Sequence, residues 1–357
     1  MTKVAILAEG LFAPRTAKTA IGVLRYAPYP VVAVVDSTRA GTDVAAHVGV
    51  GRGVPVVATV DEAIARGADV LLIGTAAAGG RIEDAYRPAL ARALERGLAV
   101  WNGLHERVLA DPALAAAARR GGGTVRELRE PPADLDVGGH RRPRAGARVV
   151  LTVGTDAAVG KMTAALELVR ALDRLGERAA FVATGQTGIA IAGAGIAVDA
   201  VVADFIAGAA ERMVCDAAET ADWVVVEGQG SLMHPGFSGV TLGLLHGSGP
   251  DLMVLCHDAA RPVVKGYEQE GLPVRPLAEC VRIYETAAMW RRPPGHPQAR
   301  VVAVAVNTVA FDDAAARAAI LDAARDTGLP AADPVREGTP AAERLAGALL
   351  DAARARA

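Results

Sequence analysis

The chain has 357 residues, 52% of them hydrophobic and 22% charged, with 38 basic residues against 40 acidic ones. This length predicts two domains, and the near-neutral charge, with no long block of like charge, does not resemble the basic surface that is typical of nucleic-acid-binding proteins. Aromatic residues make up only 4% of the chain while alanine, valine and leucine are abundant, which favours layered α/β domains.

Cysteine usage and hydropathy restrict where we expect the protein to work. The three cysteines, Cys215, Cys256 and Cys280, have no paired spacing, so we expect neither a zinc site nor a disulfide framework. Unpaired cysteines fit a reduced, cytoplasmic setting. The N-terminal MTKVAILAEG enters an apolar run directly, which does not resemble a signal peptide, and no apolar run reaches about 18 residues. We therefore expect no association with a membrane.

Residues 1–130 alternate short apolar runs with helical patterns. Such strand–helix–strand units predict a Rossmann-like parallel sheet. The loop after the first run reads EGLFAPRT and lacks the glycine fingerprint of a dinucleotide site, so a nicotinamide dehydrogenase is a weak alternative and Asp36 is expected to cap its strand. The expected strands of this half are residues 3–8, 31–36, 54–58, 68–76 and 98–105.

Several polar residues follow these strands, where parallel sheets bind ligands. They are candidates for a second site, although solvated loop residues of the same types are the simpler interpretation. These candidates are Thr16, Lys18, Gly74, Arg81 and His105.

Residues 129–147, REPPADLDVGGHRRPRAGA, are rich in proline, glycine and charge and have no periodicity, which predicts a domain boundary. We expect a linker over 131–147 between a first domain, 1–130, and a second domain, 148–357.

The second domain begins with the strongest motif of the chain, RVVLTVGTDAAVGKMTAALELVR at residues 148–170. A strand, a glycine-bracketed loop, a lysine and a helix form the arrangement that binds phosphate, because loop amides, the helix N-terminus and the ammonium group all attract anions. The loop is unusual, since five residues separate its glycines and Met162 follows Lys161, which displaces the hydroxyl that normally holds magnesium to Thr163. The alternative is a glycine-rich turn that opens an ordinary Rossmann helix.

Further polar residues close the later strands of this domain. Glu227 ends the apolar run 223–226, which is where a P-loop protein places the carboxylate that organises magnesium. His257 ends the run 252–256 and is better placed than His234 for acid–base chemistry. Asn307 ends the run 301–306, where an asparagine either bonds an adenine edge or forms a turn.

Three motifs of this half resemble dethiobiotin synthetase: GTDAAVGKMT is similar to its phosphate loop, VVVEGQGS to its VEGAGG strand end, and VAVNT to its adenine-reading asparagine strand. The whole chain resembles a bacterial and archaeal family, long classed as a domain of unknown function, with a Rossmann-like half and a P-loop half. The stretches VDAVVADFIAGAAE and TLGLLHGSGPD also resemble that family, so the likeness runs from end to end. Some members of that family are reported as D-glutamate N-acetyltransferases.

The resemblance implies that loop amides from Thr155 to Lys161 bind nucleotide phosphates and that Glu227 holds magnesium, with Asp204 as a second carboxylate. It also implies that Asn307 reads adenine. The chain departs from the pattern at Met162 and at residues 183–188, ATGQTG, so the biotin precursor is not the expected substrate.

These features predict an enzyme with two α/β domains that binds ATP and Mg²⁺ and activates a carboxylate of an amino-acid-like substrate for amide formation, as a ligase does. One alternative is an N-acyltransferase in which the loop holds the phosphates of acetyl-CoA, acting on an amino acid such as D-glutamate. A second alternative is a nucleotide-gated regulatory protein. We expect a small-molecule substrate, no nucleic acid and, because the outer helices are apolar, a homo-oligomer.

The predicted site residues fall into four groups. They are Lys161, Glu227, His257 and His234 for catalysis; Gly154, Thr155, Asp156, Ala157, Ala158, Val159, Gly160, Lys161, Met162, Thr163 and Asn307 for the cofactor; Thr163, Asp204 and Glu227 for the metal; and Gln186, Thr187, Ser231 and Arg261 for the substrate.

Overall fold

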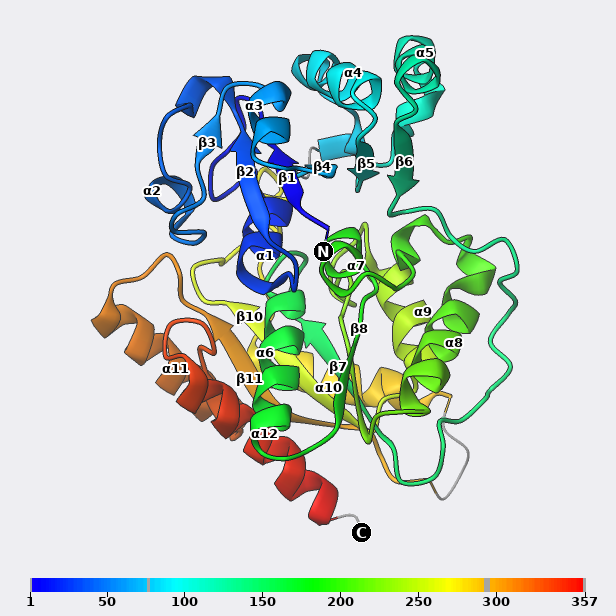
Figure 1. Ribbon diagram of the computed structural model, residues 1–357. Helices are drawn as coiled ribbons and strands as arrows, with labels where there is room; N and C mark the ends of the chain where they lie inside the picture. The colour runs from blue at the N-terminus through cyan, green and yellow to red at the C-terminus, as the bar shows by residue number, and fades with distance from the viewer. Residues whose placement is uncertain (1, 76–77, 292–295, 356–357) are drawn as a thin grey trace. The chain divides into compact units, whose positions relative to one another are not determined.

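A computed structural model describes residues 2–75, 78–291 and 296–355 of the chain (Figure 1). The contacts between residues divide the chain into two compact units. The first, here called the N-terminal unit, comprises Met1–Glu130 together with Gly185–Ala200. The second, here called the P-loop unit, comprises Pro131–Thr184 and Val201–Ala357.

The N-terminal unit contains a six-stranded parallel sheet with the order β3-β2-β1-β4-β5-β6, which is the strand order of Rossmann-like folds. Its central strands are fully buried, as the near-continuous apolar runs predict. The strands are β1 (Val4–Leu7), β2 (Val31–Val35), β3 (Val56–Val57), β4 (Val70–Ile73), β5 (Ala99–Asn102) and β6 (Thr124–Glu127). The helices are α1 (Lys18–Tyr26), α2 (Ala45–Val48), α3 (Val60–Ala65), α4 (Arg87–Glu95), α5 (Pro112–Gly121) and α7 (Gln186–Ala192).

Asp36 follows β2 and has the capping role expected of it. Its Oδ1 atom accepts hydrogen bonds from the backbone N–H groups of Thr38 and Gly10, each at 3.1 Å. The side chain is fully buried. A carboxylate buried in this way fits a capping role better than a contact to a ribose.

The segment Gly185–Ala200 belongs by its contacts to the N-terminal unit, although the sequence analysis placed it in the second domain. Tyr29 donates a hydrogen bond from its hydroxyl to the carbonyl oxygen of Ala190 at 2.8 Å, and Arg126 donates one to the carbonyl oxygen of Gly193 at 2.8 Å. The chain therefore leaves the P-loop unit after β8, completes the N-terminal unit and returns.

The P-loop unit contains a second parallel sheet, with the order β12-β11-β10-β7-β9-β8. The α/β fold class predicted from the sequence is confirmed in both units. The strands are β7 (Arg148–Gly154), β8 (Ala179–Val182), β9 (Trp223–Val226), β10 (Leu252–Asp258), β11 (Arg300–Asn307) and β12 (Ala331–Ala332). The helices are α6 (Lys161–Arg174), α8 (Ile206–Ala218), α9 (Ser238–Ser248), α10 (Leu277–Met289), α11 (Asp313–Thr327) and α12 (Thr339–Arg354).

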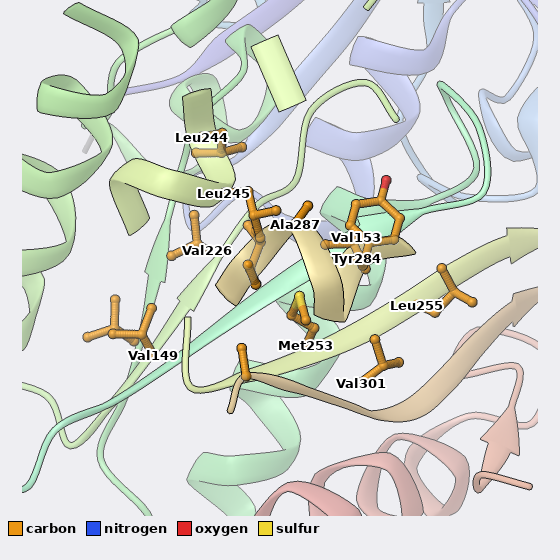
Figure 2. Close-up of a cluster of buried hydrophobic side chains, with 14 of the residues drawn as sticks. Val149, Val153, Val226, Leu244, Leu245, Met253, Leu255, Tyr284, Ala287 and Val301 are labelled. Carbon is orange, nitrogen blue, oxygen red and sulfur yellow. The ribbon is translucent and has the colours of Figure 1, made fainter. Parts of the chain in front are cut away.

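Helices cover both faces of this second sheet because successive residues of each strand point to opposite sides. Val149 and Val153 of β7 pack with residues of α8, α9 and α10, in the cluster shown in Figure 2. Val150 faces the other way and packs with residues of α6 and α12. The central strand β7 is thereby fixed, and with it the loop at its carboxyl end.

None of the helices in the described residues has both the length and the apolar character that a membrane span requires.

Candidate functional site

The loop between β7 and α6 has the conformation of a phosphate-binding loop. Gly160 has a φ of 105° and Ala158 a φ of 56°, so the chain turns sharply before Lys161 begins α6. Among the described residues no side chain caps this helix, which leaves its first-turn amides for a ligand. A helix N-terminus of this kind attracts an anion through both its N–H groups and its dipole.

Lys161 is buried inside this loop, with 6% of its surface exposed. Its ammonium group donates a hydrogen bond to the carbonyl oxygen of Asp156 at 2.9 Å. Burial lowers the pKa of Lys161 to about 8, and the neighbouring Cys256, Asp156 and Glu227 act in the opposite direction. A positive charge held in a dry pocket interacts strongly with a phosphate, because little water screens it.

Glu227 lies at the end of β9 with 4% of its surface exposed. Its Oε2 atom accepts a hydrogen bond from the backbone N–H of Thr184 at 3.0 Å, and its backbone carbonyl accepts one from the Thr184 hydroxyl at 2.6 Å. Glu227 thus follows β9, at the strand end where the sequence places it, and its function as a metal ligand stays a prediction.

The other predicted metal ligands are more dispersed. Thr163 is half-buried in the first turn of α6, and Asp204 is exposed in the short 3-10 turn Ala203–Phe205. Within the described parts of the chain, no three His, Cys, Asp or Glu side chains gather as a metal site. A magnesium ion here would need oxygen ligands from phosphate and water, which Mg²⁺ commonly uses.

The two candidate histidines differ in how many of their ring nitrogens are engaged in the hydrogen bonds described here. His257 is the last residue but one of β10, and its Nδ1 atom lies 3.1 Å from the hydroxyl of Thr155. Burial lowers the pKa of His257 below its ordinary value, so the ring is neutral at pH 7. His234 instead uses both nitrogens: Nδ1 accepts from the N–H of Gly236 at 3.1 Å, and Nε2 lies 3.0 Å from the carbonyl of Lys265. His257 is therefore the better proton acceptor.

The predicted substrate residues are divided between the two units. Gln186 and Thr187 begin helix α7 of the N-terminal unit, where the sequence indicated a turn, and the Thr187 hydroxyl lies 2.8 Å from that of Thr19. Ser231 is buried in the P-loop unit, and its hydroxyl accepts a hydrogen bond from the N–H of Met233 at 3.2 Å. Arg261 contacts the phosphate loop itself.

Asn307 and Tyr284 complete this edge of the P-loop unit. Asn307 ends β11, and its Oδ1 atom accepts a hydrogen bond from the N–H of Val309 at 3.1 Å, which leaves the amide NH₂ for another partner. Tyr284, which the sequence analysis did not select, donates from its buried hydroxyl to the carbonyl oxygen of Gly154 at 2.7 Å and accepts from the N–H of Leu232 at 3.2 Å. A lone tyrosine in a helix gives no sequence signal for such a role.

The fold and the loop together define a two-unit α/β protein with a Rossmann-like unit and a P-loop unit. Residues 37–131 match the DUF1611_N family model, described as a Rossmann-like domain of unknown function, and residues 136–345 match the DUF1611_C model, described as a P-loop domain. The chain belongs to the DUF1611 family. The resemblance stated from the sequence is confirmed.

Three relatives extend this assignment. The crystal structure of a DUF1611 family protein from Anabaena variabilis is 40% identical, with a TM-score of 0.88 over 98% of this chain and 100% of that one. A D-glutamate N-acetyltransferase from Tritonibacter scottomollicae is 35% identical over 94% of this chain and 93% of its own length. A D-glutamate N-acetyltransferase from Pseudoalteromonas sp. is 37% identical over 78% of this chain and 81% of its own. The last two of these relatives are named as enzymes, and the prediction that this chain is an enzyme is confirmed.

Proposed function

We propose that this protein transfers the acetyl group of acetyl-CoA to the amino group of an acidic D-amino acid such as D-glutamate. The observation that carries the proposal is the likeness to a D-glutamate N-acetyltransferase over 94% of the chain. The alternative raised in the sequence analysis thus becomes the leading function, and the ligase becomes the second candidate.

The loop suits the phosphates of coenzyme A on three structural grounds. The ammonium of Lys161 is buried beside the loop, the N-terminus of α6 has no side-chain cap among the described residues, and Gly228 lets the backbone pass close to the lysine. A Cβ atom at Gly228 would lie 2.9 Å from Cδ of Lys161. A phosphate held in this way needs no metal ion, which fits Met162 at the position of the usual hydroxyl ligand.

Acetyl-CoA, when bound, supplies an acyl group activated as a thioester. In this proposal Lys161 and the amides of α6 bind its phosphates and orient it. As the amine nitrogen bonds to the acetyl carbonyl carbon, His257 would receive the proton that the amine loses, at Nε2, while Nδ1–H donates to the hydroxyl of Thr155. The C–S bond of the thioester would then break, and coenzyme A would leave as a thiol after its sulfur takes the proton from His257. The carboxylates of the substrate would require cationic partners.

The role of His257 predicts a pH dependence. Because burial lowers its pKa, the ring is neutral and able to accept a proton at pH 7, and it becomes protonated only as the pH falls below its ordinary value of 6.5. We expect kcat/KM to decline on the acid side of pH 6.5. His257→Gln should lower kcat about 100-fold and remove the acid limb. An unchanged pH profile in His257→Gln would assign the proton transfer to another group.

The ATP-dependent ligase remains as a second candidate because of Glu227. Its buried carboxylate lies near Lys161, where a P-loop enzyme organises magnesium. In that function Lys161 would neutralise charge on the transferred phosphoryl group.

One assay separates the two candidates. Purified protein is incubated with a pool of D- and L-amino acids and either acetyl-CoA alone or ATP and Mg²⁺ alone, and the products are identified by mass spectrometry beside a Lys161→Met control. We expect N-acetyl-D-glutamate to form without ATP and to disappear in the variant. A new amide that appears only with ATP, together with ADP or AMP, would overturn the acetyltransferase and support the ligase.

A further inference from the structure

We infer that Asp156 and Arg261 form a clamp that shapes the phosphate loop, and that Arg261 is a positioning residue rather than a substrate ligand. The inference rests on the proposed function to the extent that a cofactor phosphate occupies the loop. It assigns a role to an acidic residue that would otherwise oppose anion binding.

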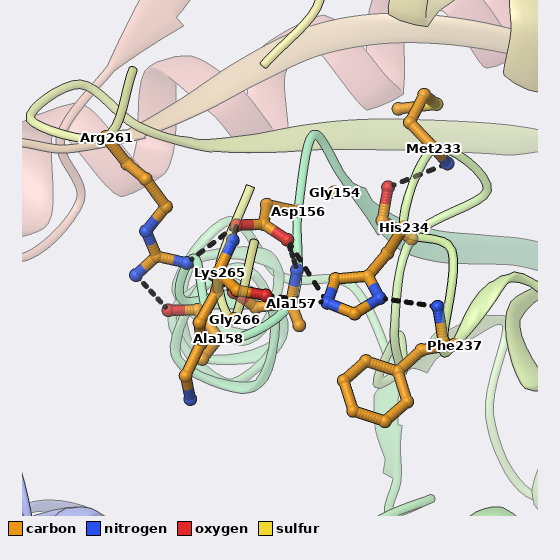
Figure 3. A network of polar contacts seen from close by, with 12 residues as sticks. Gly154, Asp156, Ala157, Ala158, Met233, His234, Phe237, Arg261, Lys265 and Gly266 are labelled. Carbon is orange, nitrogen blue, oxygen red and sulfur yellow. Dashed lines mark hydrogen bonds and ion pairs between the residues drawn. The ribbon is translucent and has the colours of Figure 1, made fainter. Parts of the chain in front are cut away.

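Asp156 presents a physical problem, because a carboxylate inside an anion-binding loop should repel a phosphate. The structure resolves it by turning the side chain away from the ligand side and burying it completely. Oδ1 accepts a hydrogen bond from the N–H of Ala157 at 2.6 Å, and Oδ2 accepts from Nη1 of Arg261 at 3.1 Å and from the N–H of Lys265 at 2.8 Å (Figure 3). The negative charge is thereby compensated within the protein.

Arg261 acts on the backbone of the loop as well as on Asp156. Its Nη1 atom donates to the carbonyl oxygen of Ala157 at 2.5 Å, and its Nη2 atom reaches the carbonyl oxygen of Ala158 at 3.5 Å and Asp258 Oδ2 at 3.0 Å. In a trans peptide the C=O and N–H groups point in opposite directions. Holding these two carbonyls toward Arg261 therefore turns the N–H groups of Ala158 and Val159 to the opposite side, where a phosphate would bind.

The clamp also holds a conformation that the loop sequence alone disfavours. Ala158 has a φ of 56°, in the left-handed region that a residue with a Cβ atom disfavours. A phosphate loop usually meets such a requirement with glycine. Here an alanine adopts it while its carbonyl oxygen faces the guanidinium group of Arg261.

Asp156 further connects the phosphate loop to the loops that follow β9 and β10. The N–H of Lys265, in the loop after β10, binds the carboxylate directly. The carbonyl of Lys265 lies 3.0 Å from Nε2 of His234, in the loop after β9, and the same nitrogen is 4.0 Å from Asp156 Oδ1. Both interactions are drawn in Figure 3. Three loops at one edge of the sheet thus meet at one carboxylate.

The inference is tested by binding. Acetyl-CoA and ADP are titrated separately into wild-type protein and Arg261→Met by calorimetry, and KM for the amino acid is measured beside them. We expect Arg261→Met to raise the Kd of the bound cofactor about 10- to 100-fold while KM for the amino acid changes less than about threefold. Arg275→Met is the matched control, because Arg275 is exposed and pairs with Glu279 at the surface.

Two further variants keep the test informative if Arg261→Met is unstable. Arg261→Lys retains the charge beside Asp156 but loses the planar fork, so it should fold and show an intermediate Kd. Adding Ala158→Gly to Arg261→Met should recover part of the lost affinity, since glycine adopts the left-handed conformation without the clamp.

The outcomes separate the clamp from the proposed function. Wild-type Kd values in Arg261→Met and Arg261→Lys, or a rise in KM for the amino acid with cofactor binding unchanged, would overturn the clamp and return Arg261 to the substrate site. Wild-type protein that binds ADP but not acetyl-CoA would overturn the proposed function, and the ADP titrations of the variants would then decide on the clamp. Binding of neither probe would overturn both.

Discussion

Replacing Lys161 by methionine is expected to abolish turnover and, at the same time, to stabilise the fold. The loss of activity follows from the buried ammonium of Lys161 at the N-terminus of α6, where it lies against the phosphate loop. We expect kcat/KM to fall by at least about 100-fold, which is typical when a preorganised charge is removed from a dry site.

The gain in stability follows from the pKa of the same group. Burial lowers the pKa of Lys161 from 10.5 to about 8, which corresponds to a penalty on the order of 3 kcal/mol for folding with a charged lysine. Between pH 8 and pH 10.5 the unfolded chain binds more protons than the native one, so the free energy of unfolding of the wild type rises with pH across that window. Methionine carries no such penalty.

Urea denaturation at several pH values measures this effect. Lys161→Met should be more stable than the wild type at pH 7, and the difference should diminish as the pH approaches 10.5. Lys3→Met is the control, because Lys3 is exposed in the N-terminal unit and its replacement should change neither stability nor cofactor binding. A variant that loses activity and is also less stable at pH 7 would show that the ammonium is solvated or paired more favourably than the buried geometry indicates.

Gly228→Ala is expected to be the most destabilising single substitution near the site. A Cβ atom at this position would lie 1.7 Å from the backbone oxygen of Thr152, far inside contact distance, and 2.9 Å from Cδ of Lys161. The N–H of Gly228 also donates to the hydroxyl of Thr152 at 2.9 Å, which binds the two strand ends together. Because β7 and β9 are central and cannot move apart freely, we expect a loss of at least about 3 kcal/mol and a displaced lysine.

Gly239→Ala provides the matched control for that experiment. Gly239 lies in α9, and no atom is within 4 Å of the Cβ that alanine would add, so helix propensity should make this change neutral or slightly stabilising. Chemical denaturation and cofactor titration are measured on both variants. A Gly228→Ala protein within about 1 kcal/mol of the wild type, with cofactor affinity intact, would mean that the two strands separate more easily than their packing density implies.

The fold could be predicted from the sequence where local pattern decides it. The apolar runs that became the central strands, and the strand–loop–helix around Lys161, each carry their signal within about 20 consecutive residues, as such motifs do. The helices α9 and α10 were not predicted. Glycines and polar residues interrupt α9, and its apolar residues surround the whole helix, so no amphipathic period marks it.

The candidate site could be predicted only in part, because its decisive contacts join distant residues. The sequence indicated that Glu227 and His257 close strands beside the phosphate loop, and the structure places both there. It could not indicate that the side chain of Asp156 turns inward toward Arg261, which lies 105 residues further along the chain. The same holds for Tyr284, whose hydroxyl meets Gly154 across 130 residues.

The excursion of Gly185–Ala200 into the N-terminal unit has a consequence for the order in which the chain folds during synthesis. A ribosome releases β1 to β6 long before α7, so the first 130 residues emerge without the helix that later packs on α1. Domains generally fold as units and N-terminal first. Here the N-terminal unit is complete only after about 70 further residues, which include the phosphate loop, have been synthesised. The phosphate loop is therefore translated before either unit is complete. Because each unit is built from two separate segments of the chain, neither corresponds to one contiguous fragment.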